Sequence, residues 1–443
     1  MNSNYDVIVS GGGTAGILAA IAAARNGAKT LLIERWGHLG GTAAFGLPFL
    51  GIFSGAGEQV NSGLAQELID RMVAAGGSLG HVHGANWEQP LGQSKYSFSL
   101  TPFDPEVLKY VAQEMALEAG TKLLFHTFVS GIIKDNNYVK GVKVFNKSGQ
   151  EAFFGKVVID ATGDADVANL AGASFQTKTE LQNASIVMRI GNVDLNKFVD
   201  ALKKEDHVKG WGSWHTRLVQ KENRYIHVAG HLVPWSGESK EVTFTAVSVR
   251  DGEIYLNATR TVNVDGTSAD DLSRAEISER KNVFSLMGAM TKNVPGMENA
   301  YLISTSPIGI RESRNILGDY TLTKEDVIEC RQFDDSIARG AYPIDIHDPA
   351  GGRTQFTFLR NGGSYSIPYR SLVPMGIEGL LIAGRCISAS KEAVGSARLM
   401  GTALSQGQAA GTAAALAVAE GKGLRQLDIS VLRDTLSQQG SII

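Results

Sequence analysis

The feature that most constrains this sequence is a glycine-rich turn near its start. Residues 11–16, Gly-Gly-Gly-Thr-Ala-Gly, match the pattern GxGxxG and lie between an apolar segment at 5–9 and an alanine-rich segment at 17–25. In such a turn the first glycine permits a tight bend, the second lets the backbone approach a pyrophosphate, and the third allows close packing of helix and strand. Free NH groups at the helix start would face the phosphate oxygens. The turn therefore predicts a dinucleotide-binding βαβ unit.

An acidic residue stands where such a unit needs one. Glu34 ends a second predicted strand at residues 29–34 and follows Gly16 by 18 residues. A carboxylate there can accept hydrogen bonds from the hydroxyls of an adenosine ribose and would repel a 2′-phosphate. A lone GxGxxG also fits an ordinary glycine turn, but the strand, the helix, the second strand and Glu34 together favour a site for FAD or NAD over one for NADP.

Length and charge indicate a globular protein with a small-molecule substrate. The chain has 443 residues, of which 43% are hydrophobic, and this length suggests two to three domains. Lys and Arg total 42 against 45 Asp and Glu, so the net charge offers no general attraction to nucleic acid or to an anionic membrane.

Cysteine use and the N-terminus point to an intracellular setting. The two cysteines, Cys330 and Cys386, lie far apart, which argues against a disulfide framework, an iron–sulfur cluster or a metal site. The N-terminus lacks a basic region and its apolar stretch is broken by glycines, so we expect no secretory signal and a cytoplasmic location. The uncharged segment 399–419 carries polar residues and glycines, and we expect a buried helix there rather than a membrane span.

The pattern along the chain predicts an α/β fold with two domains. Helices are expected at 62–75 and 105–119, and strands at 122–126, 128–134, 138–145 and 156–160. The region after residue 170 contains polar strands, a helix at 268–290 and the tryptophans Trp211, Trp214 and Trp235. An α/β pattern returns near the end, with a strand at 379–383 and a helix at 402–420. We therefore expect a discontinuous dinucleotide-binding domain at 1–170 plus 370–443, and a mixed, β-rich substrate domain at 171–369.

Several further motifs decide between FAD and NAD. The second strand leads into Gly40-Gly41-Thr42, small residues that would let the backbone approach a flavin ring, rather than into further βα units. The other motifs are Val158-Ile159-Asp160-Ala161-Thr162-Gly163-Asp164, Gly309-Ile310-Arg311-Glu312-Ser313-Arg314, Tyr342 to His347, Ile367 to Arg370, Ala383-Gly384-Arg385-Cys386 and Arg398-Leu399-Met400-Gly401-Thr402.

In these motifs the sequence resembles the bacterial FAD-dependent oxidoreductase family within the glutathione-reductase-type Rossmann flavoproteins, with a distant similarity to the flavoproteins of succinate dehydrogenase and fumarate reductase. The resemblance covers nearly the whole chain. It implies a Rossmann-type FAD-binding domain and FAD as the cofactor. The cofactor-binding residues that we expect are Gly11, Gly13, Thr14, Ala15, Gly16, Glu34, Arg35, Gly40, Gly41, Thr42, Val129, Ala161, Thr162, Gly163, Gly384, Arg385, Met400, Gly401 and Thr402.

The resemblance also suggests how the last helix would act. In such flavoproteins the NH groups at its start, here Gly401 and Thr402, point at flavin N1 and the C2 carbonyl, where a positive helix terminus stabilises the reduced flavin. Arg385 and Lys391 stand where many relatives carry a neutral or acidic residue and a histidine, so the proton-transfer group is not carried over.

Three residues are candidates for the chemistry. Arg398 precedes the helix that starts at Gly401 and is similar to the substrate-binding arginine of fumarate reductases; a structural salt bridge is the alternative. His347 shares a strand face with Asp345, and a carboxylate beside an imidazole can fix its tautomer and raise its basicity. A polar pair at a strand end is the alternative. Arg311 is expected near the ring or the substrate, unless Glu312 neutralises it.

The leading functional hypothesis is an FAD-dependent dehydrogenase or oxidase that takes hydride from a small polar substrate, an alcohol, polyol or amine, to flavin N5. The alternatives are a C=C reductase or dehydrogenase acting on a carboxylate, a flavin monooxygenase, and a non-catalytic flavin sensor. One dinucleotide motif and no redox cysteine pair disfavour a pyridine nucleotide disulfide reductase. Oxygen, a quinone and an electron-transfer protein all remain open as the electron acceptor, and the oligomeric state is not predicted.

We expect the purified protein to be yellow and to release FAD on denaturation, because Glu34 and the glycine turn suit an adenosine pyrophosphate. Chromatography of the released flavin tests this expectation. Release of FMN alone, or of no flavin, would contradict it.

Overall fold

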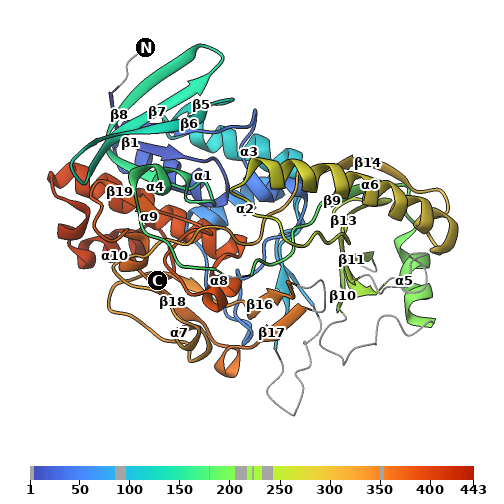
Figure 1. Cartoon of the computed structure of the whole chain (residues 1–443). Helices are drawn as coiled ribbons and strands as arrows, with labels where there is room; N and C mark the ends of the chain where they lie inside the picture. The colour runs from blue at the N-terminus through green and yellow to red at the C-terminus, as the bar shows by residue number, and fades with distance from the viewer. Residues whose placement is uncertain are drawn as a thin grey trace.

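The computed structural model describes residues 4–84, 96–178, 180–204, 217–221, 224–231, 243–349 and 354–443 (Figure 1). Trp211, Trp214 and Trp235 lie outside these residues. Within them, the chain forms two large sheets with helices packed around them, and the α/β class predicted from the sequence is confirmed.

The first sheet combines strands from both ends of the chain. Its order is β5 (Lys122–Leu124), β2 (Thr30–Ile33), β1 (Asn4–Ser10), β8 (Gly149–Asp160), β7 (Tyr138–Asn146) and β6 (Phe128–Asp135), and β19 (Leu380–Ile382) pairs with β8. Strands β5, β2, β1, β8 and β19 run parallel to one another, whereas β7 and β6 form an antiparallel extension. Strands β1, β2 and β19 are largely apolar and buried, and α1 packs against β1 and β2 while α9 packs against β1, β8 and β19. Their carboxyl ends lie at one edge, where ligands of such sheets bind.

Two long helices from opposite ends of the sequence pack against each other beside this sheet (Figure 1). They are α1 (Thr14–Arg25) and α9 (Met400–Glu420), and nearly all their residues are buried. Gly407 and Gly411 of α9 face the backbone of α1: a Cβ at these positions would lie 2.0 Å from the Ala15 carbonyl oxygen and 2.1 Å from that of Ala19. The absence of two side chains therefore sets how closely the helices approach.

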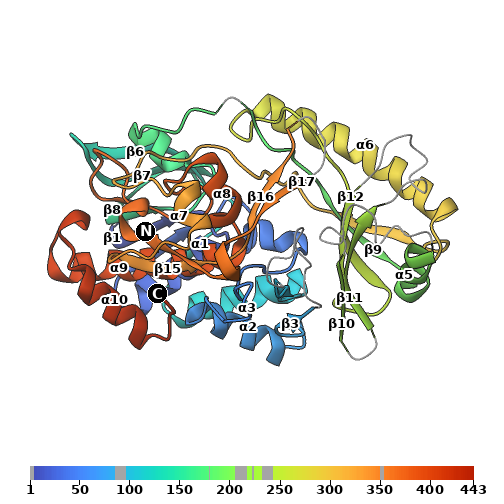
Figure 2. The same ribbon diagram turned by 90° about the horizontal axis from the view of Figure 1, so that it is seen from below.

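The second sheet is antiparallel and has a core of its own. Its order is β10 (Arg217–Lys221), β11 (Arg224–His231), β12 (Thr243–Val247), β13 (Glu253–Asn257), β9 (Val187–Gly191) and β14 (Tyr301–Thr305). The long helix α6 (Ala269–Asn293) and the short α5 (Leu195–Lys204) accompany it, on the side of the molecule away from α10 (Ile429–Gln438) (Figure 2). Its core draws on residues from Ala184 to Ile308, whereas Ile316, Ile337 and Ile367 pack into the core of the first sheet. The domain division at residues 170 and 370 stays a prediction.

Shorter elements connect the two sheets. The pair β16 (Ile344–His347) and β17 (Thr354–Thr357) lies between them in Figure 2. The remaining elements are α2 (Leu64–Ala74), α3 (Pro105–Glu118), α4 (Asp166–Ala171), α7 (Lys324–Ile328), α8 (Lys391–Ala397), β3 (Val82–His83), β4 (Ser99–Leu100), β15 (Ser336–Gly340), β18 (Tyr365–Pro368) and the 3₁₀ turns η1 (Gly41–Phe45), η2 (Arg360–Gly362), η3 (Tyr369–Leu372) and η4 (Leu424–Gln426).

Within the described ranges, none of the helices has both the length and the apolar composition needed to cross a membrane. The same residues contain no cluster of three or more His, Cys, Asp or Glu side chains arranged to hold a metal ion.

The glycine contact between α1 and α9 gives a stability prediction. Gly411→Ala should lower the free energy of unfolding by about 1–3 kcal/mol, because the new methyl group must push α9 away from the Ala19 carbonyl. Urea denaturation of the two proteins measures the difference. The control is Gly288→Ala in α6, where a Cβ meets no atom within 4 Å and should leave stability unchanged or raise it by about 0.5–1 kcal/mol. Equal stability of Gly411→Ala and the wild type would contradict the account of this contact.

Candidate active site

A cavity of about 430 Å³ runs from the glycine turn to the second sheet. Ser10, Ile33 and Ala161, at the carboxyl ends of β1, β2 and β8, line one part of it, and residues of β11, β12 and β13 line another. The cavity therefore begins at the carboxyl ends of the parallel strands, where such sheets bind nucleotides, and extends to the second sheet.

The three glycines of the turn differ in what surrounds them. Gly11 has a φ of +98°, and a Cβ there would lie 2.5 Å from the Ala161 carbonyl oxygen. A Cβ on Gly16 would lie 1.7 Å from the Gly11 carbonyl oxygen. A Cβ on Gly13 would meet only the Gly41 Cα, at 3.9 Å, and would project into the cavity that Gly13 lines. Gly11 and Gly16 are thus required by the fold, whereas Gly13 keeps space open for a ligand.

Glu34 is held rigidly beside this space. Its Oε2 accepts a hydrogen bond of 2.6 Å from the Gly12 NH, and its Oε1 accepts one of 2.7 Å from the Trp36 NH. Each carboxylate oxygen has a second lone pair, so the group can still accept hydrogen bonds from a ribose.

A buried carboxylate shapes the opposite side of the turn. Asp160 accepts hydrogen bonds from the NH and hydroxyl of Thr162, at 3.0 and 2.7 Å, and from the Ala168 NH at 2.9 Å. Burial raises the pKa of Asp160 to about 6, against the opposing effect of these donors. Asp160 therefore holds the loop Ala161–Gly163 against the cavity, and its role is structural.

The start of α9 approaches the cavity from the other end of the chain. Met400 lines the cavity, and Thr402 is fully buried with no hydrogen-bond partner for its Oγ1 among the described residues. The Gly401 NH donates to the Leu50 carbonyl at 3.2 Å, so this NH is engaged within the protein. The helix N-terminus still brings partial positive charge to this part of the cavity.

Most of the predicted cofactor residues line this cavity. Four of them are not among the lining residues: Gly16, Gly40, Gly401 and Thr402. Those in the lining are Gly11, Gly13, Thr14, Ala15, Glu34, Arg35, Gly41, Thr42, Val129, Ala161, Thr162, Gly163, Gly384, Arg385 and Met400. Their individual roles in binding stay predictions.

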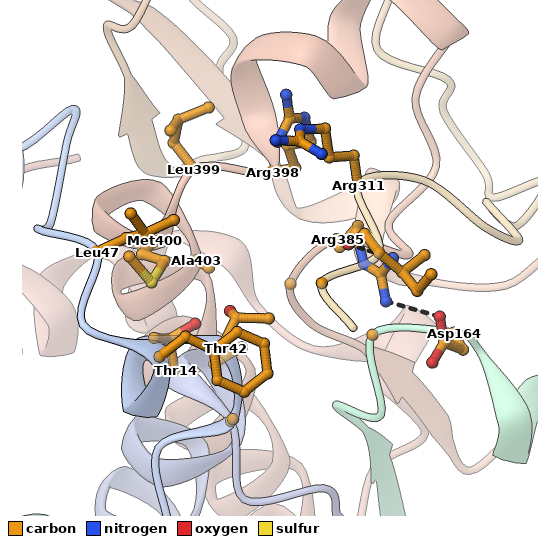
Figure 3. A pocket seen from close by; sticks show the side chains of 18 of the residues that line it. Thr14, Thr42, Leu47, Asp164, Arg311, Arg385, Arg398, Leu399, Met400 and Ala403 are labelled. Atoms are coloured by element: carbon orange, nitrogen blue, oxygen red, sulfur yellow. Dashed lines mark hydrogen bonds and ion pairs between the residues drawn. The ribbon is translucent and has the colours of Figure 1, made fainter. Parts of the chain in front are cut away.

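Arg385 is engaged within the protein. Its Nη2 lies 2.6 Å from Asp164 Oδ1, as Figure 3 shows, and its Nη1 donates to the Ile310 carbonyl at 2.9 Å. This ion pair is locally neutral, and it ties the loop after β8 to the loop after β19.

The three candidate catalytic residues meet at one end of the cavity. Strand alternation places Asp345 and His347 side by side, with 3.4 Å between Asp345 Oδ1 and His347 Nε2. Arg398 Nη2 lies 3.7 Å from Asp345 Oδ2 and donates to the Asp345 carbonyl at 3.2 Å. Figure 3 shows Arg311 and Arg398 on the same side of the cavity, away from Thr14, Thr42 and Met400.

Arg311 is buried and is not neutralised by its sequence neighbour. Its Nη1 donates to the Asn183 carbonyl, whereas Glu312 accepts from the NH and Nε2 of Gln182, both at 3.0 Å. Burial, followed by the charges of Arg260 and Arg398, lowers the pKa of Arg311 well below its usual range. Such a group is strongly stabilised by an anion beside it.

Arg260 is a member of this cluster that the sequence did not reveal. It follows β13, lines the cavity, and donates to the Thr259 carbonyl at 2.6 Å and to Asn257 Oδ1 at 3.3 Å. No motif surrounds it, and only the folding of β13 against β9 brings it to the cavity.

Burial and these arginines together keep the histidine neutral. Burial and the charges of Arg311, Arg260 and Arg398 hold the pKa of His347 well below its usual range, so the imidazole is neutral. Its Nδ1 lies 3.1 Å from Thr354 Oγ1, and its backbone NH donates to Gln182 Oε1 at 3.0 Å.

Residues 6–436 match the family described as FAD dependent oxidoreductase. The chain belongs to this family. Its membership confirms the family and the FAD cofactor predicted from the sequence.

Similarity to individual proteins is more limited. A digeranylgeranylglycerophospholipid reductase from Methanoculleus marisnigri is 30% identical over 181 residues, which are 39% of this chain and 42% of the relative. The enzyme of that name from Methanocaldococcus jannaschii is 32% identical over 183 residues, or 40% and 43% of the two chains. This chain thus spans less than half the length of these relatives.

Among solved structures, a geranylgeranyl bacteriochlorophyll reductase-like protein from Thermoplasma acidophilum superposes with a TM-score of 0.50 at 15% identity, covering 99% of this chain and 84% of that one. The likeness concerns the fold alone, a Rossmann-type FAD-binding domain with additional antiparallel sheet.

We expect the FAD pyrophosphate to lie in the cavity next to Gly13, and a substitution tests this expectation. Gly13→Val should abolish FAD retention without unfolding the protein, because Gly13 has a φ of −76° that valine can adopt and its Cβ meets no protein atom closer than 3.9 Å. Flavin content after purification and circular dichroism measure the two effects. The comparison variant is Gly16→Val, which should fail to fold because its side chain overlaps the Gly11 carbonyl. Wild-type FAD content in Gly13→Val would show that this turn is not the binding site.

Proposed function

We propose that the protein is a dehydrogenase of a small hydroxy carboxylate. The observation that carries this proposal is the convergence of Arg260, Arg311 and Arg398 on the buried pair Asp345 and His347 at one end of the FAD-binding cavity. Among the substrate classes that the sequence left open, an alcohol is kept and an amine is disfavoured. The arginines add the requirement that the substrate also carries a carboxylate.

Charge is the reason for the carboxylate. Guanidinium groups present planar sets of donors that match carboxylate oxygens, and buried pairs of this kind are strongly attractive. The Arg398 side chain is 13% exposed, and its Nε has no hydrogen-bond partner among the described residues. A protonated amine would instead face three positive charges of the same sign.

The neutral imidazole favours oxidation of the substrate. When bound, FAD supplies an acceptor for the hydride that leaves the substrate carbon. Asp345 beside Nε2 favours the tautomer with a proton on that atom, which leaves Nδ1 of His347 to accept the proton of the substrate hydroxyl. In the free enzyme Thr354 Oγ1, 3.1 Å from Nδ1, donates to this lone pair, and the substrate hydroxyl replaces Thr354 as the donor when it binds.

Substrate binding would itself prepare the base. Burial is the main cause that lowers the pKa of His347, and the arginine charges add to it. A bound carboxylate would offset the charges of Arg311 and Arg398 and so raise the pKa of His347 part of the way back. Asp345 then stabilises the imidazolium. The His347 imidazole therefore becomes more basic when the anion is bound.

A second candidate is a C=C reductase acting on a carboxylate. The names of the relatives support it, since the two curated proteins are called reductases and the solved structure is called reductase-like. A neutral His347 is a poor proton donor, and for this reason we place oxidation first.

The role of His347 as the base and that of Arg398 in binding the carboxylate predict different kinetic defects. With a hydroxy carboxylate identified by bleaching of the flavin, His347→Ala should slow flavin reduction at saturating substrate by about 10²–10⁴-fold. Arg398→Ala should mainly weaken substrate binding, by at least about tenfold. Rapid-mixing measurement of flavin reduction against substrate concentration separates the two effects.

The control is Arg280→Ala, which removes an exposed arginine of α6 that pairs with Glu276 and should change neither quantity. FAD should stay bound in all three variants. Reduction of His347→Ala at the wild-type rate would remove His347 as the base.

A further inference from the structure

The second sheet has one apolar face and one face that lines the cavity, and its strand register shows which residues share each. One cross-strand row lies entirely in the core of this sheet: Val228, Ala246, Leu256 and Met188. The neighbouring row lies on the opposite face, because side chains alternate along a strand. Its members all line the cavity: Ala229, Thr245, Asn257 and Val187. The cavity is therefore bounded here by a row with two polar side chains at its centre.

Asn257 connects this row to the arginine cluster. Its Oδ1 accepts a hydrogen bond of 3.3 Å from Arg260 Nη1, and only 9% of the residue is exposed. Thr245 pairs with Asn257 on the next strand, and such cross-strand neighbours have Cβ atoms roughly 5 Å apart. The two polar side chains thus begin beside the arginines and continue away from them across the sheet.

Closing the cavity does not require polar side chains in this row. Ala229 and Val187 line the cavity in the same row, and valine suits a strand at least as well as threonine does. Asn257 also orients Arg260, whereas the Thr245 hydroxyl has no hydrogen-bond partner among the described residues. Polar groups with little access to water need such partners. The Thr245 hydroxyl and the Asn257 NH₂ are therefore groups that a bound substrate can pair.

We infer that the substrate is a polyhydroxy carboxylate, whose carboxylate is held by the arginines and whose further hydroxyls pair with Thr245 and Asn257. This inference rests on the proposed function, because it names the class of hydroxy carboxylate that the site takes. A hydroxyl both donates and accepts hydrogen bonds, as do the threonine hydroxyl and the asparagine amide. All these groups are uncharged, so recognition of the anion stays with the arginines.

The apolar part of the cavity lies elsewhere. Leu47 and Met400 are on the side of Thr14, away from Arg311 and Arg398 (Figure 3). That side suits the flavin ring. A substrate with an alkyl chain would leave Thr245 and Asn257 unpaired, and a site built to hydrogen-bond a hydroxyl discriminates against an analogue that lacks it.

Three six-carbon ligands test this inference: gluconate, hexanoate and glucitol. Gluconate carries a carboxylate and hydroxyls, hexanoate only the carboxylate, and glucitol only hydroxyls. The flavin of the FAD-loaded protein is first reduced with dithionite under nitrogen, so that none of the ligands can be oxidised. Isothermal titration calorimetry then gives each dissociation constant. We expect gluconate to bind at least about tenfold more tightly than either of the others.

Substitutions of Thr245 assign the preference to this row. Thr245→Val removes the hydroxyl but keeps a branched side chain that suits a strand. It should weaken gluconate binding by about tenfold and leave hexanoate binding unchanged or tighter. Thr245→Ser keeps a hydroxyl and should keep the wild-type ratio of the two dissociation constants. The control Thr305→Val makes the same change in β14 of the same sheet, outside the cavity lining, and should leave the ratio unchanged.

Failure of the proposed function and failure of this inference give different results. Glucitol binding as tightly as gluconate, or no binding of either acid, would contradict the proposed carboxylate site itself. Hexanoate binding as tightly as gluconate would leave that site in place and overturn the polyhydroxy inference. An unchanged ratio in a folded Thr245→Val protein would show that Thr245 does not bind a substrate hydroxyl.

Discussion

The close packing of α1 against α9 is the contact on which the arrangement of the site depends. These helices come from opposite ends of the chain, and Gly407 and Gly411 let α9 lie against the Ala15 and Ala19 carbonyls. Their N-terminal residues, Thr14 and Met400, consequently line the same cavity. Two helix termini carrying partial positive charge thus face one ligand space, a suitable environment for a pyrophosphate and an electron-rich ring.

The second constraint is the cost of burying charge. Arginines reach one end of the cavity from the end of β13, from the loop after β14 and from the turn between α8 and α9, so that no single element carries the cluster. Asp345, which lies 3.7 Å from Arg398, compensates part of this charge. The remaining charge is complementary to an organic anion and, together with burial, keeps His347 neutral. Specificity and basicity would then follow from the same electrostatic arrangement.

Much of this could be predicted from the sequence because it depends on local pattern. The strand before the glycine turn, the helix after it and Glu34 lie within one continuous segment, and the alternation in β16 places Asp345 beside His347. The strand at 379–383 was expected and is Leu380–Ile382, and the helix expected at 402–420 begins two residues earlier, at Met400.

Arg260 could not be predicted in the same way, because its importance arises only where β13 meets the cavity. The hydrogen bond from the Gly401 NH to the Leu50 carbonyl could not be predicted either, because it depends on a loop about 350 residues away in the sequence. Contacts between distant segments leave little trace in either segment alone.

A crystal structure of the FAD-loaded protein with bound pentanoate tests the central claim most directly. The account predicts the carboxylate between the guanidinium groups of Arg311 and Arg398, at about 2.7–2.9 Å from their nitrogens, with His347 Nδ1 facing the carbon chain. A carboxylate bound elsewhere, or guanidinium groups occupied by the FAD phosphates, would contradict it.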